Sequence, residues 1–269
     1  MAQDKDLTIA YDPWHPLTQL TPARIALGRT GMSLPTRAHL DFQLAHALAR
    51  DAVHIPLDFD SLKQSLDNCG YENQVLQSQA DTQAQYLQRP DYGRCLSEQS
   101  RQQLSAQQQQ AIDVVIVIAD GLSSKAITNH ALAFLQFLVP ALTEADYQLA
   151  PISLVKHGRV AIGDAVAEHY NAPLCITLIG ERPGLSSPDS MGIYFTYQAK
   201  ANISTDADRN CISNIHANGL SYEHALKKLL YLINQAEKLK LSGVALKDET
   251  TESNINTNIE RFDSTRFHL

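Results

Sequence analysis

The sequence predicts an α/β protein whose C-terminal half holds a mainly parallel, Rossmann-like sheet. One observation is the run "DVVIVIADG" at residues 113–121, whose β-branched apolar core is typical of a strand buried on both faces. Two more apolar runs, at 150–158 and 173–181, enclose a short helical pattern at 163–172. This alternation of strands and helices favours parallel strands joined by right-handed crossovers.

Three further elements complete the expected C-terminal region. Residues 191–198 have the pattern of a fourth strand, and only about ten residues link it to the third. Because that link is short for a crossover helix, we expect these two strands to be antiparallel. One helix is expected from about Lys125. The clearest helix spans 221–243, with Ser221 as its N-terminal cap and Gly243 as its stop signal.

The N-terminal region has a different character. A helix fits residues 36–53, where leucines recur every four positions, and residues 60–110 are rich in glutamine with helical spacing. We therefore expect a helical N-terminal domain over 1–110, followed by the sheet domain over 111–243. The polar stretch 244–269 lacks a core pattern and is expected to be a disordered tail.

Composition narrows the classes of function. The chain has 269 residues, a net charge of -7 and no basic stripe, so a nucleic-acid partner is not expected. Its longest apolar runs are shorter than the roughly 20 residues that span a bilayer, so no membrane partner is expected either. No secretory signal opens the sequence, which favours the cytoplasm. Four cysteines without a CxxC pair are expected to be free thiols: Cys69, Cys95, Cys175 and Cys211.

Polar residues follow each of the first three expected strands. Asp120 and Gly121 follow the first, residues 156–160 ("KHGRV") the second, and residues 181–184 ("ERPG") the third. Ligands of open α/β sheets bind beyond the carboxyl ends of the strands, so these clusters predict a polar crevice on one rim. The polar stretch 205–219 reads as a loop that offers further donors and acceptors. Each cluster alone also fits an ordinary surface turn.

The common catalytic and nucleotide motifs are missing. No GxGxxG follows the first strand, which disfavours a nicotinamide oxidoreductase, and no P-loop, GxSxG or HExxH occurs. His157 and His216 fit structural histidines at loop edges better than metal ligands. The residues alone therefore leave the ligand of the crevice open.

Six segments carry a resemblance to a known family, and they occur in the family's order. The chain resembles the small subunit of ethanolamine ammonia-lyase, an adenosylcobalamin-dependent enzyme that converts ethanolamine to acetaldehyde and ammonia. The segments are "TPARIALGRTG" (21–31), "YLQRPDYGR" (86–94), "ADGLSSKAI" (119–127), "KHGRVAIGD" (156–164), "GERPGL" (180–185) and "DRNCISNIH" (208–216).

The resemblance implies a binding role for this chain. Val160, Glu181 and Cys211 fall on positions that contact cobalamin in the family, and the cofactor lies between this subunit and a larger barrel subunit. The DxHxxG motif is absent, so the cobalt is expected to keep the cofactor's own base. The resemblance implies neither a catalytic residue nor a metal ligand in this chain, and activity only in a hetero-oligomer with the large subunit.

One alternative belongs to a different class of protein. The same crevice would also suit a non-enzymatic assembly or regulatory subunit that binds a nucleotide. Enclosure of the protein in a bacterial microcompartment is left open by the sequence.

Overall fold

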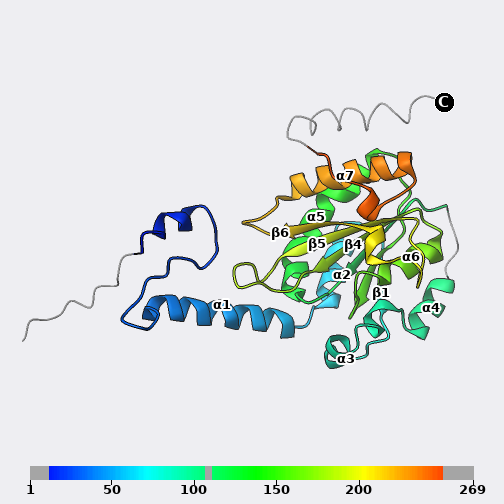
Figure 1. Cartoon of the computed structure of the whole chain (residues 1–269). Helices are drawn as coiled ribbons and strands as arrows, with labels where there is room; N and C mark the ends of the chain where they lie inside the picture. The colour runs from blue at the N-terminus through cyan, green and yellow to red at the C-terminus, as the bar shows by residue number, and fades with distance from the viewer. Residues whose placement is uncertain (1–11, 107–110, 251–269) are drawn as a thin grey trace, which may run out of the picture.

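The computed structural model describes residues 12–106 and 111–250, which form one six-stranded sheet with helices on both faces (Figure 1). The strand order is β1-β3-β2-β4-β5-β6. The strands are β1 (Asn73–Gln77), β2 (Val114–Ala119), β3 (Ile152–Lys156), β4 (Leu174–Gly180), β5 (Met191–Tyr197) and β6 (Arg209–Ile215).

Seven α-helices are present in the described part of the chain. They are α1 (Thr36–His54), α2 (Phe59–Asn68), α3 (Gln83–Gln88), α4 (Glu98–Ser105), α5 (Ser124–Glu144), α6 (Ile162–Tyr170) and α7 (Tyr222–Leu239). Short 3-10 segments lie at His15–Gln19, Tyr92–Arg94, Asp206–Asp208 and Gly243–Ala245.

The pairing of the strands confirms the α/β class. β1, β3, β2 and β4 are parallel neighbours, whereas β4–β5 and β5–β6 are antiparallel. The antiparallel pairing expected for residues 191–198 is therefore confirmed. The sheet as a whole is mixed, so the Rossmann-like arrangement is not confirmed.

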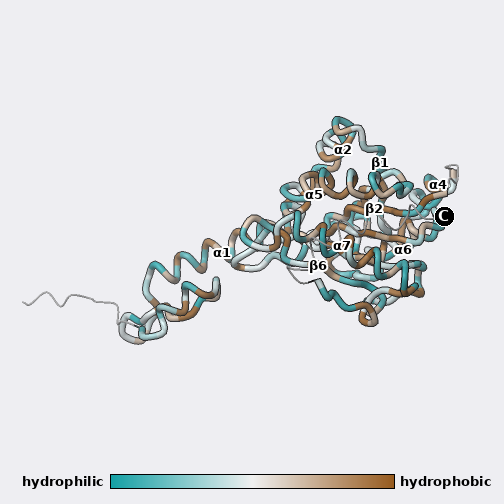
Figure 2. The backbone as a smooth tube through the Cα atoms, turned by 90° about the horizontal axis from the view of Figure 1, so that it is seen from above, coloured by the Kyte–Doolittle hydropathy of each residue, from teal (hydrophilic) through white to brown (hydrophobic). Residues whose placement is uncertain are grey.

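Two apolar layers sandwich the sheet. One joins α2, α5 and α7 to alternate residues of the strands, and the other lies under α4 and α6. Every residue of β2 is buried, as its unbroken apolar run predicts. α5 is long and apolar enough to meet the criteria for a membrane-spanning helix, but its apolar face packs on the sheet core. Figure 2 shows the hydrophobic segments gathered in the central strands and the helices beside them.

Two strands differ from the sequence prediction. Residues 1–110 are not helical throughout, because Asn73–Gln77 pairs with β3 as an edge strand, and the helical N-terminal domain is not confirmed. The expected loop at 205–219 contains β6. Its buried residues Ile212 and Ile215 are three apart because a bulge adds a residue opposite β5, and this hides the two-residue period of a strand.

The helix caps follow the expected chemistry. The side chains of Ser123 and Ser221 accept hydrogen bonds from the backbone of the first turns of α5 and α7. α7 ends at Leu239, with Lys240 in the left-handed conformation, and so stops before Gly243. The chain then packs back on the core through buried Leu246, so the tail does not begin at 244. Residues 251–269 lie outside the described residues.

The N-terminal arm, residues 12–55, projects from the sheet domain (Figure 1). In α1 only Ala52 is buried, although the helix carries an apolar stripe. Large apolar side chains recur along the arm and are exposed, namely Trp14, Leu17, Leu20, Leu27, Met32, Leu34, Leu40, Phe42, Leu44, Leu48 and Ile55. An apolar surface of this extent marks an interaction site.

Candidate functional site

The ends of β2 and β3 are tied together by the buried carboxylate of Asp120. Its Oδ2 accepts a hydrogen bond from the backbone N–H of His157 at 2.9 Å, and its Oδ1 from those of Gly158 at 3.1 Å and Gly121 at 3.0 Å. Burial raises the pKa of Asp120 to about 6, against the opposing effect of these donors. The first two predicted polar clusters therefore meet, as expected for one rim.

The ends of β2 and β4 approach so closely that only glycine fits. The backbone N–H of Leu122 donates to the Gly180 carbonyl at 3.0 Å. A Cβ at Gly180 would lie 2.1 Å from the Ser123 carbonyl oxygen, and a Cβ at Gly121, whose φ is +63°, would lie 2.3 Å from the Gly180 carbonyl oxygen. The polar cluster at 181–184 thus starts beside Asp120 and Gly121. The close contact between the two backbones fixes where the chain after β4 begins.

Val160 lies on a firmly anchored turn between β3 and α6. His157 opens the turn with a φ of +53°, and its Nδ1 lies 3.0 Å from the carbonyl oxygen of Ala80. The Arg159 N–H donates to the Gly93 carbonyl at 2.8 Å. Half-buried Val160 accepts a hydrogen bond from the first turn of α6. The turn therefore holds an apolar side chain at the N-terminal end of α6.

Glu181 leaves β4 with its side chain directed over β5 and β6. Its Oε2 accepts hydrogen bonds from the Ser190 hydroxyl at 2.5 Å and from the Asn214 N–H at 3.3 Å. The absence of a side chain at Gly192 makes room for Oε1, since a Cβ there would lie 2.9 Å from it. Within the described residues no hydrogen bond to Oε1 is formed, so this oxygen can accept one from a ligand.

Cys211 lies on β6 directly opposite Tyr194 of β5. Burial raises the pKa of the Cys211 thiol, the hydrogen bond with Tyr194 partly offsets this, and the nearby Glu181 charge adds to it. Burial likewise raises the pKa of the Tyr194 phenol. Both groups are therefore neutral at physiological pH. A neutral thiol is a weak nucleophile, so Cys211 is suited to contact a ligand rather than to attack it.

The structure brings two of the three predicted residues together. Glu181 and Cys211 are neighbours across β5, whereas within the described residues no hydrogen bond links Val160 to either. Val160 is connected to them through the sheet. α6 packs on β4 at Gly163, where a Cβ would lie 2.5 Å from Thr177 Oγ1, and Thr177 pairs with Tyr194 beside Cys211. Glu181, Cys211 and the turn that carries Val160 therefore lie on the same side of the sheet, and we call the part of that side formed by β5 and β6 the β5–β6 face.

The loop that carries Glu181 is fixed at several points. The Ser123 hydroxyl donates to the Pro188 carbonyl at 2.9 Å, and the Asn129 amide donates to Asp189 at 2.9 Å. The Ser187 hydroxyl lies 3.2 Å from His216 Nε2. His216 thus takes part in the hydrogen bonds that fix this loop, so the backbone that carries Glu181 is held in place without a ligand.

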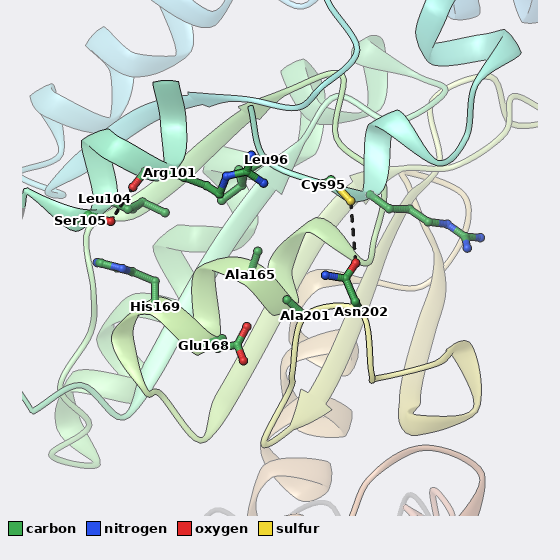
Figure 3. Close-up of a pocket in the computed structure, with 11 residues that line it drawn as sticks. Cys95, Leu96, Arg101, Leu104, Ser105, Ala165, Glu168, His169, Ala201 and Asn202 are labelled. Atoms are coloured by element: carbon green, nitrogen blue, oxygen red, sulfur yellow. Dashed lines mark hydrogen bonds between the residues drawn. The ribbon is translucent and has the colours of Figure 1, made fainter. Parts of the chain in front are cut away.

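Two hollows occupy different places relative to this face. One, of about 470 Å³, runs along the outer edge of β6 and includes Cys211 and Asn214 in its lining. The other, of about 370 Å³, lies between α4, α6 and the loop after β5 (Figure 3). None of the three predicted residues lines that second hollow, whose walls include Arg101, Glu168 and His169.

Sequence reasoning missed Tyr194, Ser190 and Gly192, which shape the site around Glu181 and Cys211. Tyr194 was placed in a strand, but nothing in the sequence reveals that the neighbouring strand is β6. A usable signal is the glycine two residues before Tyr194, because a glycine inside a strand often marks a close approach of another group.

The fold and the site define an α/β protein whose mixed sheet carries Glu181, Tyr194 and Cys211 close together on one side. The family model for the ethanolamine ammonia-lyase light chain (EutC) matches residues 11–247. The chain belongs to this family.

Curated relatives agree with that family over nearly their whole length. The chain is 52% identical over 256 residues to the ethanolamine ammonia-lyase small subunit of Pseudomonas fluorescens (strain Pf0-1), which covers 93% of each chain. It is 52% identical to that of Pseudomonas aeruginosa (strain LESB58) over 89% of each chain. The small subunit of Pseudomonas putida (strain W619) is 50% identical over 91% of each.

Proposed function

We propose that this chain is the small subunit of an adenosylcobalamin-dependent ethanolamine ammonia-lyase and that it holds cobalamin at the interface with a catalytic large subunit. The observation that carries the proposal is the family match over residues 11–247, combined with the proximity of Glu181 and Cys211 on the accessible β5–β6 face. The protein would act in the cytoplasm, and the complex would convert ethanolamine to acetaldehyde and ammonia.

The chemistry of the β5–β6 face fits a corrinoid. The edge of a corrin ring carries neutral amides, which donate hydrogen bonds through their N–H groups, and Glu181 Oε1 offers an acceptor for one of them. Cys211 supplies a polarizable contact and Val160 an apolar one. A dinucleotide would instead need donors for its phosphates, and the carboxylate of Glu181 would repel them.

In this proposal the residues of the chain bind and orient the cofactor. Cobalamin, with its own base on the cobalt, supplies the radical chemistry when it is bound. Glu181 would fix the rotation of the corrin edge, because Ser190 and Asn214 hold its carboxylate in one orientation. Val160 and Cys211 would cover apolar surface and exclude water. The ethanolamine site and the catalytic groups would lie in the large subunit.

The exposed N-terminal arm supports a large protein partner. Its apolar side chains are too numerous and too clustered for a free surface. The Arg24 guanidinium donates to the Leu185 carbonyl at 3.3 Å, which links the arm to the loop that begins at Glu181. A large subunit that packs on the arm would therefore also reach the cofactor face.

Reconstitution tests the proposed function. We expect the purified chain to show no deamination of ethanolamine, with or without adenosylcobalamin, because the family resemblance assigns the catalytic groups to the large subunit and the Cys211 thiol, with its raised pKa, is a weak nucleophile. Mixed with the large subunit and adenosylcobalamin, it should give acetaldehyde and ammonia, and the complex should retain the visible absorption of cobalamin on a desalting column. Turnover by the isolated chain would refute the division of roles. A colourless complex that retains a nucleotide instead would support the assembly-subunit alternative.

Substitution of Glu181 tests the binding site. Glu181→Gln keeps the size of the side chain and an oxygen that accepts from Ser190, but it places an N–H₂ group where Oε1 would accept from a corrin amide. We expect cobalamin affinity of the reconstituted complex to fall about 10-fold, in line with about 1.5 kcal/mol for a bond to a charged group. Glu168→Gln, an exposed carboxylate on α6, is the matched control and should bind normally. Equal affinity of the Glu181→Gln complex and wild type in a spectroscopic titration would remove Glu181 from the site.

A further inference from the structure

A buried ion pair joins α6 to β6 on the same side of the sheet as the β5–β6 face. Arg209 Nη1 and Nη2 donate to Asp164 Oδ1 and Oδ2 at 2.6 Å and 2.7 Å, and the two side chains are only 3% and 2% exposed. Nη1 also lies 3.3 Å from Thr196 Oγ1 of β5, and Nη2 donates to the Ser204 carbonyl at 3.3 Å. The guanidinium therefore spans the width of β5 to reach the helix.

The two ends of this ion pair lie next to two of the three cofactor positions. Arg209 and Cys211 are two residues apart on β6 and so point to the same face of the sheet. Asp164 is in the first turn of α6, which directly follows the turn that carries Val160. A change in the distance between Asp164 and Arg209 would therefore change the distance between Val160 and Cys211.

We propose that Asp164 and Arg209 are positioning residues that set the width of the β5–β6 face for its ligand. The inference rests on the proposed function, since it takes the ligand to be cobalamin. The paired hydrogen bonds fix the end of α6 against β6 in both distance and orientation. They hold the apolar contact of Val160 and the thiol of Cys211 at the separation that the corrin edge needs.

The chemistry of the pair favours a role in geometry over a role in stability. A buried ion pair is often no more stabilising than apolar side chains of similar volume, because both charges lose their hydration. A bidentate guanidinium–carboxylate contact fixes the relative orientation of the two elements that it joins. Apolar side chains can slide past each other and do not fix it. α6 packs mainly on β2 and β4, and β5 and β6 extend the sheet beyond them, so the ion pair supplies the hydrogen bonds that join α6 to β6.

The test replaces the pair by apolar residues of similar size. Asp164→Leu/Arg209→Met should leave the melting temperature of the reconstituted complex close to that of wild type. Its dissociation constant for cyanocobalamin, a coloured corrinoid that does not form the adenosyl radical, should rise at least about 10-fold in a visible titration. For adenosylcobalamin, KM should rise with little change in kcat. Arg209→Lys, which keeps the charge but not the fork, provides a second variant if the apolar pair fails to fold.

Two further variants separate positioning from general stability. Gln74→Leu removes a buried polar group at the opposite edge of the sheet, where Gln74 donates to Ser153 and to Tyr170 at the C-terminal end of α6. It leaves the Asp164–Arg209 pair at the N-terminal end of α6 intact, so it should not alter corrinoid affinity. When Asp164→Leu/Arg209→Met is added to Cys211→Ala, it should weaken corrinoid binding less than it does in the wild-type protein. The contact of Cys211 with the ligand, which the double substitution would displace, is already absent in Cys211→Ala.

Each outcome decides between the proposals. Weak binding by Asp164→Leu/Arg209→Met or Arg209→Lys, with normal binding by Gln74→Leu, supports the positioning role. Wild-type affinity in a folded variant overturns that role and leaves the proposed function intact. If Gln74→Leu loses as much corrinoid affinity as the ion-pair variants do, the positioning role is also overturned. The loss would then follow from general destabilisation of the protein. If the wild-type complex itself binds neither corrinoid, the proposed function and the positioning role both fail.

Discussion

Gly180→Ala is expected to lower the free energy of unfolding by about 3 kcal/mol, the upper end of the usual range for overpacking. The added Cβ would lie 2.1 Å from the carbonyl oxygen of Ser123 and 2.8 Å from that of Asp120. Both atoms belong to backbone at the end of β2 and the start of α5, so they cannot move aside as a flexible side chain would. The strands must separate instead, and the Leu122–Gly180 hydrogen bond at 3.0 Å would be lost.

Gly184→Ala is a matched control four residues along the same loop. A Cβ at Gly184 would have its nearest neighbour at 3.7 Å, an ordinary contact distance. The free energy of unfolding should therefore change by less than about 1 kcal/mol, and a small gain is expected because alanine reduces the freedom of the unfolded chain. Denaturant unfolding followed by circular dichroism measures both variants. Equal stability of the two would show that β2 and β4 are free to move apart at this rim.

How far the sequence predicts the fold depends on how locally each element is determined. β2 is apolar from end to end, β4 is apolar except for Thr177, and both are buried on both faces, so their positions follow from composition alone. β1, with the sequence NQVLQ, forms only because β3 offers it a free edge. β6 forms around a bulge. Neither edge strand has a local pattern that distinguishes it from a polar helix or a loop.

The same distinction applies to the site. The polar cluster at 181–184 could be predicted because it directly follows a buried strand, whereas the resemblance alone singles out Val160, Glu181 and Cys211, whose contact with a cofactor stays a prediction. The pairing of Asp164 with Arg209 could not be predicted, because 45 residues separate the two partners and only the position of β6 brings them together. A usable hint is the presence of Asp164 within the apolar face of a short helix, where an isolated charge requires a partner.

The stability of the wild-type protein should depend on the protonation of Asp120 between about pH 4 and pH 6. Burial raises the pKa of Asp120 to about 6 in the folded state, whereas an unfolded aspartate has a pKa of about 4. In this interval the folded state holds more protons than the unfolded state, so the free energy of unfolding falls as the pH rises. A shift of about two units corresponds to roughly 3 kcal/mol, fully present below pH 4 and lost above pH 6.

Asp120→Asn removes this titration while keeping the side chain's shape. Its amide places an N–H₂ group where a carboxylate oxygen accepts from His157 or Gly158, and the buried backbone donor left unpaired should cost about 1–3 kcal/mol at every pH. The stability advantage of wild type over Asp120→Asn should therefore be largest near pH 4 and shrink toward pH 7. Urea unfolding at half-unit pH steps measures this advantage, and carbon-13 NMR of the Asp120 carboxyl group reports the pKa directly.

Asp120→Ala is the internal control for the pH dependence, because it removes every acceptor and also cannot titrate. The difference between the alanine and asparagine variants should stay constant with pH, while each differs from wild type by an amount that changes with pH. An advantage of wild type that grows with pH would mean that the three backbone donors outweigh burial and depress the pKa. In that case the end of β3, and with it the turn that carries Val160, would be held by a permanently ionised carboxylate rather than by one that titrates near pH 6.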